Sequence, residues 1–242
     1  MLKSGFKIVF IIMAAFLLHK AAFAADVIEL PPEELAQESV LPIFDKSVSV
    51  KNRNIITAKK FDANLFYGFA MTEPIADVSK LGLSLYYNWS EDHAIGLLFA
   101  KNFSGLSTYA DQLSKPPYNL DFNRAPKPDM TVMADYNIKA FYGKMSLSKS
   151  LVLNTMLYGS LSAGVVKFDT KTYPGIAFGF GQKFYFNKNW AVRADLRLYA
   201  NQAPIPFKQG ALKPSDPVPD KSTFDERITY TTNLDLGVSY LF

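Results

Sequence analysis

From Phe61 to the last residue, apolar side chains alternate with polar or small ones at a period of two, which is the period of a β-strand. In residues 81–89 the odd positions hold Leu, Leu, Leu, Tyr and Trp, whereas the even positions hold Gly, Ser, Tyr and Asn. Similar runs recur along the chain, and each predicts one strand. They cover residues 61–70, 81–90, 94–103, 131–141, 152–166, 175–186, 190–200 and 229–242.

The segments between these runs alternate in length, which indicates how the strands are connected. Tight turns are predicted at Glu91-Asp92, Tyr142-Gly143-Lys144 and Asn187-Lys188-Asn189, and longer loops at 71–78, 104–130, 167–174 and 201–228. Outer-membrane barrels have short periplasmic turns and longer extracellular loops. The alternation therefore assigns the tight turns to the periplasm.

Two all-β architectures fit these runs: a soluble sandwich with its apolar face inward, or a barrel with its apolar face toward lipid. The polar face carries many small residues, namely Gly82, Ser84, Gly96, Gly179, Gly181 and Gly237. Glycine weakens a strand and gives a solvent-exposed face no advantage, whereas a narrow lumen needs the space it leaves. We therefore predict an all-β fold, an eight-stranded antiparallel up-and-down transmembrane β-barrel.

The alternation also points charged side chains into the barrel. They are Asp62, Asp135, Lys139, Lys183, Arg193, Asp195, Arg197 and Asp235. Because buried charges must be paired, and because eight strands leave an interior just wide enough for side chains, we expect a closed lumen filled by salt bridges. Gln182 falls on the lipid face, an exception that a bulge or an error in register would explain.

Aromatic residues gather next to the predicted turns. An aromatic girdle at the periplasmic interface would comprise Trp89, Tyr142, Phe186, Trp190, Tyr240 and Phe242. Amphipathic rings prefer this level of a membrane, so their position supports the barrel over the sandwich.

The first residues resemble a secretory signal. Lys3 and Lys7 precede an apolar run at 8–18, and Ala22 and Ala24 occupy the small positions of a cleavage site. This run is shorter than the roughly 20 residues of a membrane helix, so a retained anchor is the less favoured alternative. We expect a cleaved signal at 1–24, a short periplasmic N-terminal segment at 25–60 and an outer-membrane β-barrel at 61–242. The 25–60 segment would act as a tether or would dock a partner.

Few residues support catalysis or cofactor binding. The chain has no Cys, and removing the signal with His19 leaves only His93, beside a predicted turn where we expect it to be solvated. Removing the signal also lowers the net charge from +4 to about +1 and leaves no basic cluster for nucleic acid. We therefore expect no enzyme activity, cofactor, metal site or nucleic-acid partner.

The last residues are similar to the signal read by the barrel assembly machinery, with Asp235, Gly237, Tyr240 and Phe242 at its polar, glycine and aromatic positions. A narrower resemblance covers about residues 28–242. Segments 50–54, 163–166, 179–185 and 191–197 resemble the outer-membrane β-barrel domain family of myxobacteria and related predatory bacteria, although Lys183 stands where the family is expected to have Arg. Some members are associated with gliding motility, and the family has no settled biochemical activity.

The expected function is therefore that of an integral outer-membrane barrel with a structural, anchoring or surface-interaction role, associated with the envelope or motility. The alternative is a narrow channel or transporter gated by the interior charges, and a lipid-modifying enzyme is less favoured. The expected partners are outer-membrane lipid, the barrel assembly machinery and a periplasmic or surface protein. The long loops 104–130 and 201–228 are the candidate surfaces for such a protein.

Overall fold

The computed structural model describes residues 53–73, 75–122, 125–148, 151–205, 215 and 224–242. The predicted signal, its cleavage site and residues 25–52 lie outside this part of the chain. The chain divides into two units, one of residues 1–48 and 145–152 and one of residues 49–144 and 153–242. The second unit holds the β-barrel described below, apart from two strand ends at residues 145–148 and 151–152, which fall in the first unit.

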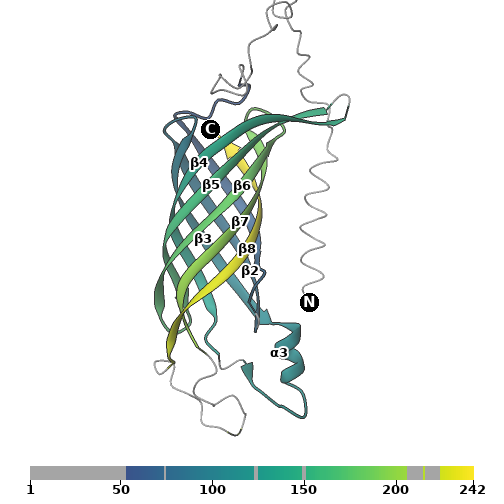
Figure 1. Ribbon diagram of the computed structural model, residues 1–242, viewed down its shortest axis with the longest axis vertical. Coiled ribbons are helices and arrows are strands. Elements are labelled where there is room, and N and C mark those ends of the chain that lie inside the picture. The colour runs from purple at the N-terminus through teal and green to yellow at the C-terminus, as the bar shows by residue number, and fades with distance from the viewer. Residues whose placement is uncertain (1–52, 74, 123–124, 149–150, 206–214, 216–223) are drawn as a thin grey trace, which may run out of the picture. The chain divides into compact units, whose positions relative to one another are not determined.

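Eight strands form one closed antiparallel barrel, in which each strand pairs with its neighbours in sequence and β8 pairs with β1 (Figure 1). The strands are β1 (Lys60–Ala70), β2 (Ala76–Asn88), β3 (His93–Leu106), β4 (Pro128–Ser148), β5 (Leu151–Phe168), β6 (Thr172–Tyr185), β7 (Trp190–Pro204) and β8 (Glu226–Leu241). This confirms the predicted fold class. Closure leaves no strand edge unpaired, which a strand in lipid requires because lipid offers no hydrogen bonds.

The two ends of the barrel differ in their connections. We call the end with residues 89–92 and 186–189 the turn end, and the end with residues 71–75, 107–127, 169–171 and 205–225 the loop end. Two predicted connections are wrong. Residues 142–144 are part of β4, and the predicted loop 167–174 is a tight turn, in which the Phe168 amide donates to the Lys171 carbonyl at 2.9 Å.

The β3–β4 loop contains a short helix that the alternation did not predict, α3 (Thr108–Leu113). The Ser107 side chain caps it by accepting from the Ala110 amide at 3.1 Å. Ala110 and Phe122 form a small core of this loop with Ile75, Leu106, Leu113 and Leu120 packed around it. Among the described residues, no helix is long and apolar enough to cross a membrane.

Candidate functional site

The outer face of the barrel is covered by large apolar side chains. Leu65, Leu97, Phe178 and Phe180 are each 58–65% exposed, although they lie in the middle of paired strands. A soluble protein rarely exposes an apolar surface of this extent. Because the polar residues point into the lumen instead, this exterior is that of an outer-membrane β-barrel in contact with lipid.

Replacing Phe178 by Lys tests the lipid contact. At mid-membrane the charge is expected to lower the free energy of unfolding by about 2–4 kcal/mol, measured by urea titration of the barrel in lipid vesicles. The same change at Tyr230, which is also exposed but belongs to the loop end of β8, should cost about 0–1 kcal/mol. Equal, negligible costs at both positions would indicate a water-exposed surface and contradict the membrane assignment.

Five of the six residues predicted for the aromatic girdle point outward at the turn end. The Trp190 and Tyr240 rings, on paired residues of β7 and β8, lie 4.8 Å apart, and Tyr240 lies 4.9 Å from Phe242. Trp89 and Phe186 are 43% and 38% exposed. The sequence reading missed Phe61 and Tyr87, which join the same level with rings 5.0 Å apart.

Tyr142 is the exception, because it is buried inside the barrel rather than exposed in the girdle. Ala140 and Phe141 are both exposed, so the alternation in β4 shifts by one residue and turns Tyr142 inward. Such a shift arises where a strand pairs with its neighbours, so the alternation of residues in the sequence does not reveal it. The prediction for Tyr142 is therefore wrong.

His93 is also placed differently from the prediction. It begins β3 with its ring stacked on those of Trp89 and Tyr136, and a hydrogen bond of 2.9 Å joins its Nδ1 to the Tyr136 hydroxyl. It is therefore held in an aromatic cluster rather than being a freely solvated turn residue.

The lumen contains all eight charged residues predicted for it. They are buried, and the only other buried charged residue among the described positions is Lys80. Lys80 points to the same face as Gly82 and Ser84, because even-numbered residues of this strand face the lumen. It was not predicted, because the predicted strand began at Leu81. The alternation would have placed Lys80 in the lumen if the strand had been extended to its true start at Ala76.

The centre of the lumen is an arginine held between two tyrosines. The Arg193 guanidinium lies 4.8 Å from the centre of the Tyr86 ring and 4.9 Å from that of Tyr158. It donates to both oxygens of Asp195, at 2.6 and 3.1 Å, and the Tyr158 hydroxyl donates to the same carboxylate at 2.5 Å. Charge-assisted bonds and cation–π contacts together compensate the buried charge.

A second arginine joins strands on opposite sides of the lumen. Arg197 of β7 donates to Asp135 of β4 at 3.2 Å, and lies 3.7 and 3.8 Å from the carboxylates of Asp195 and Asp235. The Tyr86 hydroxyl donates to Asp135 at 2.6 Å. We call Tyr86, Asp135, Tyr158, Arg193, Asp195 and Arg197 the central layer. Each of these residues is at most 2% exposed, so the layer fills the lumen.

Ion pairs flank the central layer on both sides. Toward the loop end, Lys80 lies 2.9 Å from Asp235, the acid in the middle of the last strand. Toward the turn end, Lys183 pairs with Asp62. Lys139 has no carboxylate within ion-pair distance among the described residues, and its ammonium donates to the Thr57 hydroxyl at 2.7 Å.

Glycines on the lumen face make room for this layer, as the sequence reading proposed. A Cβ on Gly181 would overlap the Asp195 carboxylate and the Tyr158 hydroxyl, and a Cβ on Gly96 would overlap the Tyr86 ring. Because glycine has no side chain, the long side chains of other strands can occupy the space next to it.

Gln182 does face outward, without a bulge or a change of register. Its neighbours in the sheet are Leu157 and Ala194, and the pairing continues unbroken on both sides. The alternation was correct at this position, and Gln182 is a polar residue on the outer face.

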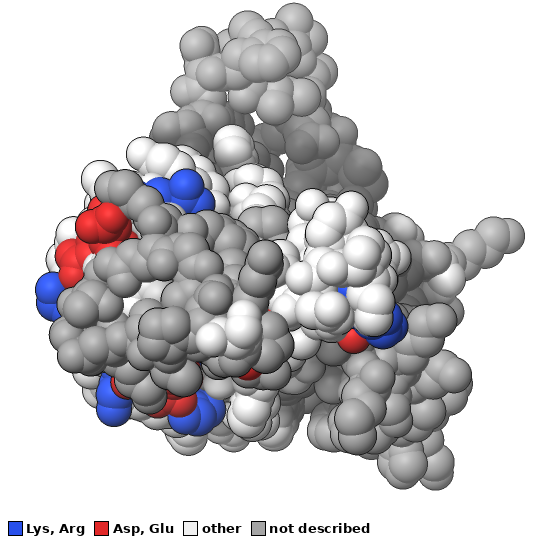
Figure 2. All heavy atoms as spheres, turned by 90° about the horizontal axis from the view of Figure 1, so that it is seen from below, with Lys and Arg blue, Asp and Glu red and all other residues white. Residues whose placement is uncertain are grey.

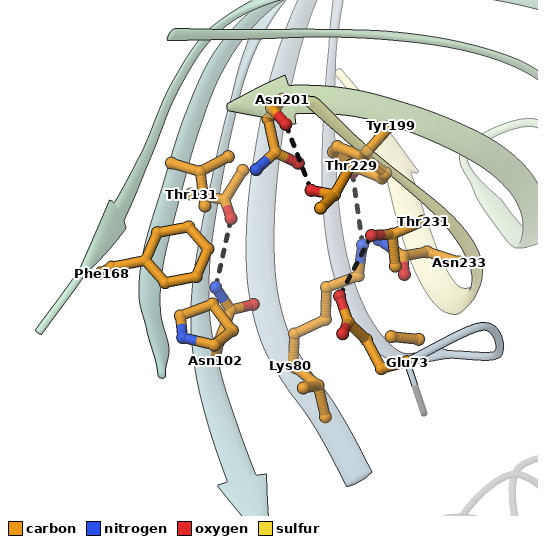
Figure 3. Close-up of a pocket in the computed structure, with 14 residues that line it drawn as sticks. Glu73, Lys80, Asn102, Thr131, Phe168, Tyr199, Asn201, Thr229, Thr231 and Asn233 are labelled. Atoms are coloured by element: carbon orange, nitrogen blue, oxygen red, sulfur yellow. Dashed lines mark hydrogen bonds between the residues drawn. The ribbon is translucent and has the colours of Figure 1, made fainter. Parts of the chain in front are cut away.

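The loop end holds a cavity of about 60 Å³, room for a few water molecules (Figure 3). Its polar wall is joined by hydrogen bonds from Lys80 to Tyr199, Asn102 to Thr131, Thr229 to the Asn201 carbonyl, and Thr231 to Glu73. Burial raises the pKa of Glu73, and the bond from Thr231 opposes this only in part. The rim of this end carries basic and acidic side chains next to one another (Figure 2).

The turn end is covered by residues 53–59, which precede β1. Glu91, in the β2–β3 turn, accepts hydrogen bonds from the amides of Thr57 and Ala58, from the Thr57 hydroxyl and from Arg53, all at 2.9–3.1 Å. Burial alone would raise the pKa of Glu91, but these bonds and the charge of Arg53 outweigh it and hold the pKa below the usual value for glutamate.

The depressed pKa of Glu91 predicts how this contact responds to acid. Its contribution to stability is fully present above the unfolded-state pKa and is lost as the pH falls through the lower folded-state pKa. We expect the amide NMR shifts of Thr57 and Ala58 to be constant from pH 8 to pH 5 and to titrate only below the usual range of glutamate. Glu91→Gln should abolish the titration, and a midpoint above that range would contradict the expectation.

No group of three or more metal-binding side chains occurs in the described ranges. Comparison with known proteins finds no matching family model and no matching curated protein. Three solved β-barrel structures are similar to the chain, each covering 76% of it. They are the N-terminal β-barrel domain of Pseudomonas aeruginosa OprF (10% identity, 98% of that chain, TM-score 0.40), Neisserial surface protein A (15%, 96%, 0.41) and a de novo designed transmembrane β-barrel (9%, 97%, 0.33).

Proposed function

We propose that this protein is a closed, non-conducting outer-membrane barrel with an anchoring, structural or surface-interaction role. The observation that carries the proposal is the central layer, in which Arg193 and Arg197 are 0% and 2% exposed and are bound from β2, β4 and β5. An ion that crossed the lumen would have to displace several of these charge-assisted bonds at once, at a cost of about 1.5–3 kcal/mol each.

Reconstitution into planar lipid bilayers tests the closed lumen. The purified full-length barrel is expected to give no steady single-channel current at neutral pH. Reproducible unitary currents from the parent protein would overturn the proposal and favour the alternative, a narrow channel gated by the lumen charges. Under that alternative, Arg193→Ala or Asp195→Ala should raise the conductance of an already conducting pore.

The biological context of the proposal rests on the sequence. The two long connections, 107–127 and 205–225, are both at the loop end, which supports placing α3 with its loop at the cell exterior and the turn end in the periplasm. The roles of Asp235, Gly237, Tyr240 and Phe242 in assembly, the relation to the myxobacterial family, and a link to motility stay predictions. In whole cells, crosslinkers placed in loop 104–130 and in segment 25–60 would identify a surface or periplasmic partner.

A further inference from the structure

Residues 53–59, hereafter the plug, close the turn end without belonging to any strand. Ile55 is 1% exposed and packs in a cluster with Tyr142, Met156, Tyr185, Ala191 and Leu241, which come from β4 to β8. Ile56, the next residue, is 57% exposed. The plug thus inserts one apolar side chain into the mouth that these five strands surround.

Three polar side chains of the barrel form hydrogen bonds with residues 53–58. Glu91 binds it from the β2–β3 turn, as described above. The Tyr142 hydroxyl lies 3.2 Å from both the Asn54 and the Ile55 amides and accepts from them, while Lys139 donates to Thr57. The Arg53 guanidinium also lies 5.0 Å from the centre of the Tyr142 ring. Glu91 makes the largest number of these bonds, so we call it the clamp.

The plug meets the hydrogen-bonded strands at its last residue, where the Lys59 amide donates to the Asn88 carbonyl of β2 at 2.6 Å. Pairing of β1 with β2 begins at Lys60, and pairing of β1 with β8 begins at Asp62. Lys59 also has a φ of 62°, a left-handed backbone conformation, where the plug joins β1. Release of residues 53–58 would therefore break their own polar contacts and leave both the Lys59–Asn88 bond and the strand pairs intact, which is the situation in which local opening is easiest.

Side chains deeper in the lumen form a second seal below the plug. This second seal consists of the Lys183–Asp62 ion pair and, closer to the middle of the barrel, the central layer. Between plug and layer is a small cavity of about 10 Å³, whose lining includes Asn137, Lys139 and Lys183. Loss of the plug would remove the Thr57 hydroxyl from Lys139 and connect this cavity to the water outside. The turn end would then be a blind recess, open to water on one side and closed by the central layer on the other.

We propose that residues 53–59 are a detachable plug, that the Glu91 clamp controls its release, and that release opens a blind basic recess at Lys139 while the central layer stays closed. Release at the clamp would thus change the turn end without opening a pore.

Because the chain contains no Cys, single cysteines can report on the plug in the full-length barrel. In Ile56→Cys the thiol should react rapidly with a water-soluble maleimide, and in Ile55→Cys it should be protected. Adding Glu91→Ala to Ile55→Cys should speed its labelling by about 10- to 100-fold, because several hydrogen bonds to the carboxylate are lost. The same barrel should remain silent in planar bilayers.

The neighbouring acid provides a matched control. Asp92 is 66% exposed and lies 3.9 Å from Arg53, so adding Asp92→Ala should leave labelling of Ile55→Cys unchanged. Heat-modified migration on gels would show that each variant is folded. The plug would be excluded if Ile55→Cys reacted as fast as Ile56→Cys, and the clamp if Glu91→Ala had no effect on labelling. Steady current from a folded Glu91→Ala barrel would overturn the second seal, independently of the result for the parent protein.

Discussion

Replacing Asp195 by asparagine is expected to lower the free energy of unfolding of the barrel by about 3–5 kcal/mol, the usual cost of leaving a buried charge without its partner. Asparagine keeps the shape of the side chain, so packing changes little. The loss comes from Arg193, whose guanidinium would keep no carboxylate, and from the Tyr158 hydroxyl, which donates to Asp195 at 2.5 Å. Urea titration in lipid vesicles would measure it.

A double-mutant cycle separates the charge from the packing. Arg193→Met combined with Asp195→Asn should cost less than the sum of the two single changes, because the double variant removes both charges of the pair. An exposed ion pair serves as a control: Lys171 and Glu226 lie 2.7 Å apart at the loop end, and Lys171→Ala should cost at most about 1 kcal/mol. If Asp195→Asn were as stable as the parent, the central layer would not be a network of compensating charges.

Replacing Gly179 by alanine should reduce the stability or the yield of folded barrel more than such a small change normally would. The new Cβ would overlap the carbonyl oxygen of Leu196 and lie 2.9 Å from the Cα of Arg197. Because these are backbone atoms of the paired strand, they cannot move aside without disturbing the β6–β7 register. We expect a loss of about 1–3 kcal/mol, typical of overpacking, or failure to fold.

Gly159→Ala is the matched control, since Gly159 lies in the middle of neighbouring β5 and the nearest atom to its new Cβ is 3.9 Å away. This variant should unfold at the urea concentration of the parent or slightly above it, because alanine restricts the unfolded chain more than glycine does. Equal behaviour of the two variants in urea titration and heat-modified migration would show that close strand approach at Gly179 is unimportant.

Alternation alone was sufficient to assign the two faces of the strands. The side chains of a strand point to opposite faces because of its own backbone geometry, so Leu97 and Asp195 could be placed outside and inside before any pairing was known. Even Gln182, which contradicted the expected polarity, lies where its position in the run puts it. The eight buried charges named from the sequence follow from the same local rule, whereas the choice of a barrel over a sandwich came from the small residues on the polar face.

Where this rule failed, contacts distant in sequence decide the structure. The inward turn of Tyr142 depends on a shift within β4, and β4 continues through residues 142–144 to Ser148. Likewise the plug needs a mouth formed by strands from the whole length of the chain, so a stretch read as a tether in the sequence holds Ile55 in the barrel.

The sequence by itself therefore determined the number of strands, the side of the sheet that most strand residues occupy and the presence of charges in the lumen, because these depend on residues close together in the chain. Only the tertiary structure decided which charges meet. Lys183 of β6 pairs with Asp62 of β1, and Lys80 of β2 pairs with Asp235 of β8. These partners depend on the depth at which each strand is set in the closed barrel, which no single run of residues specifies.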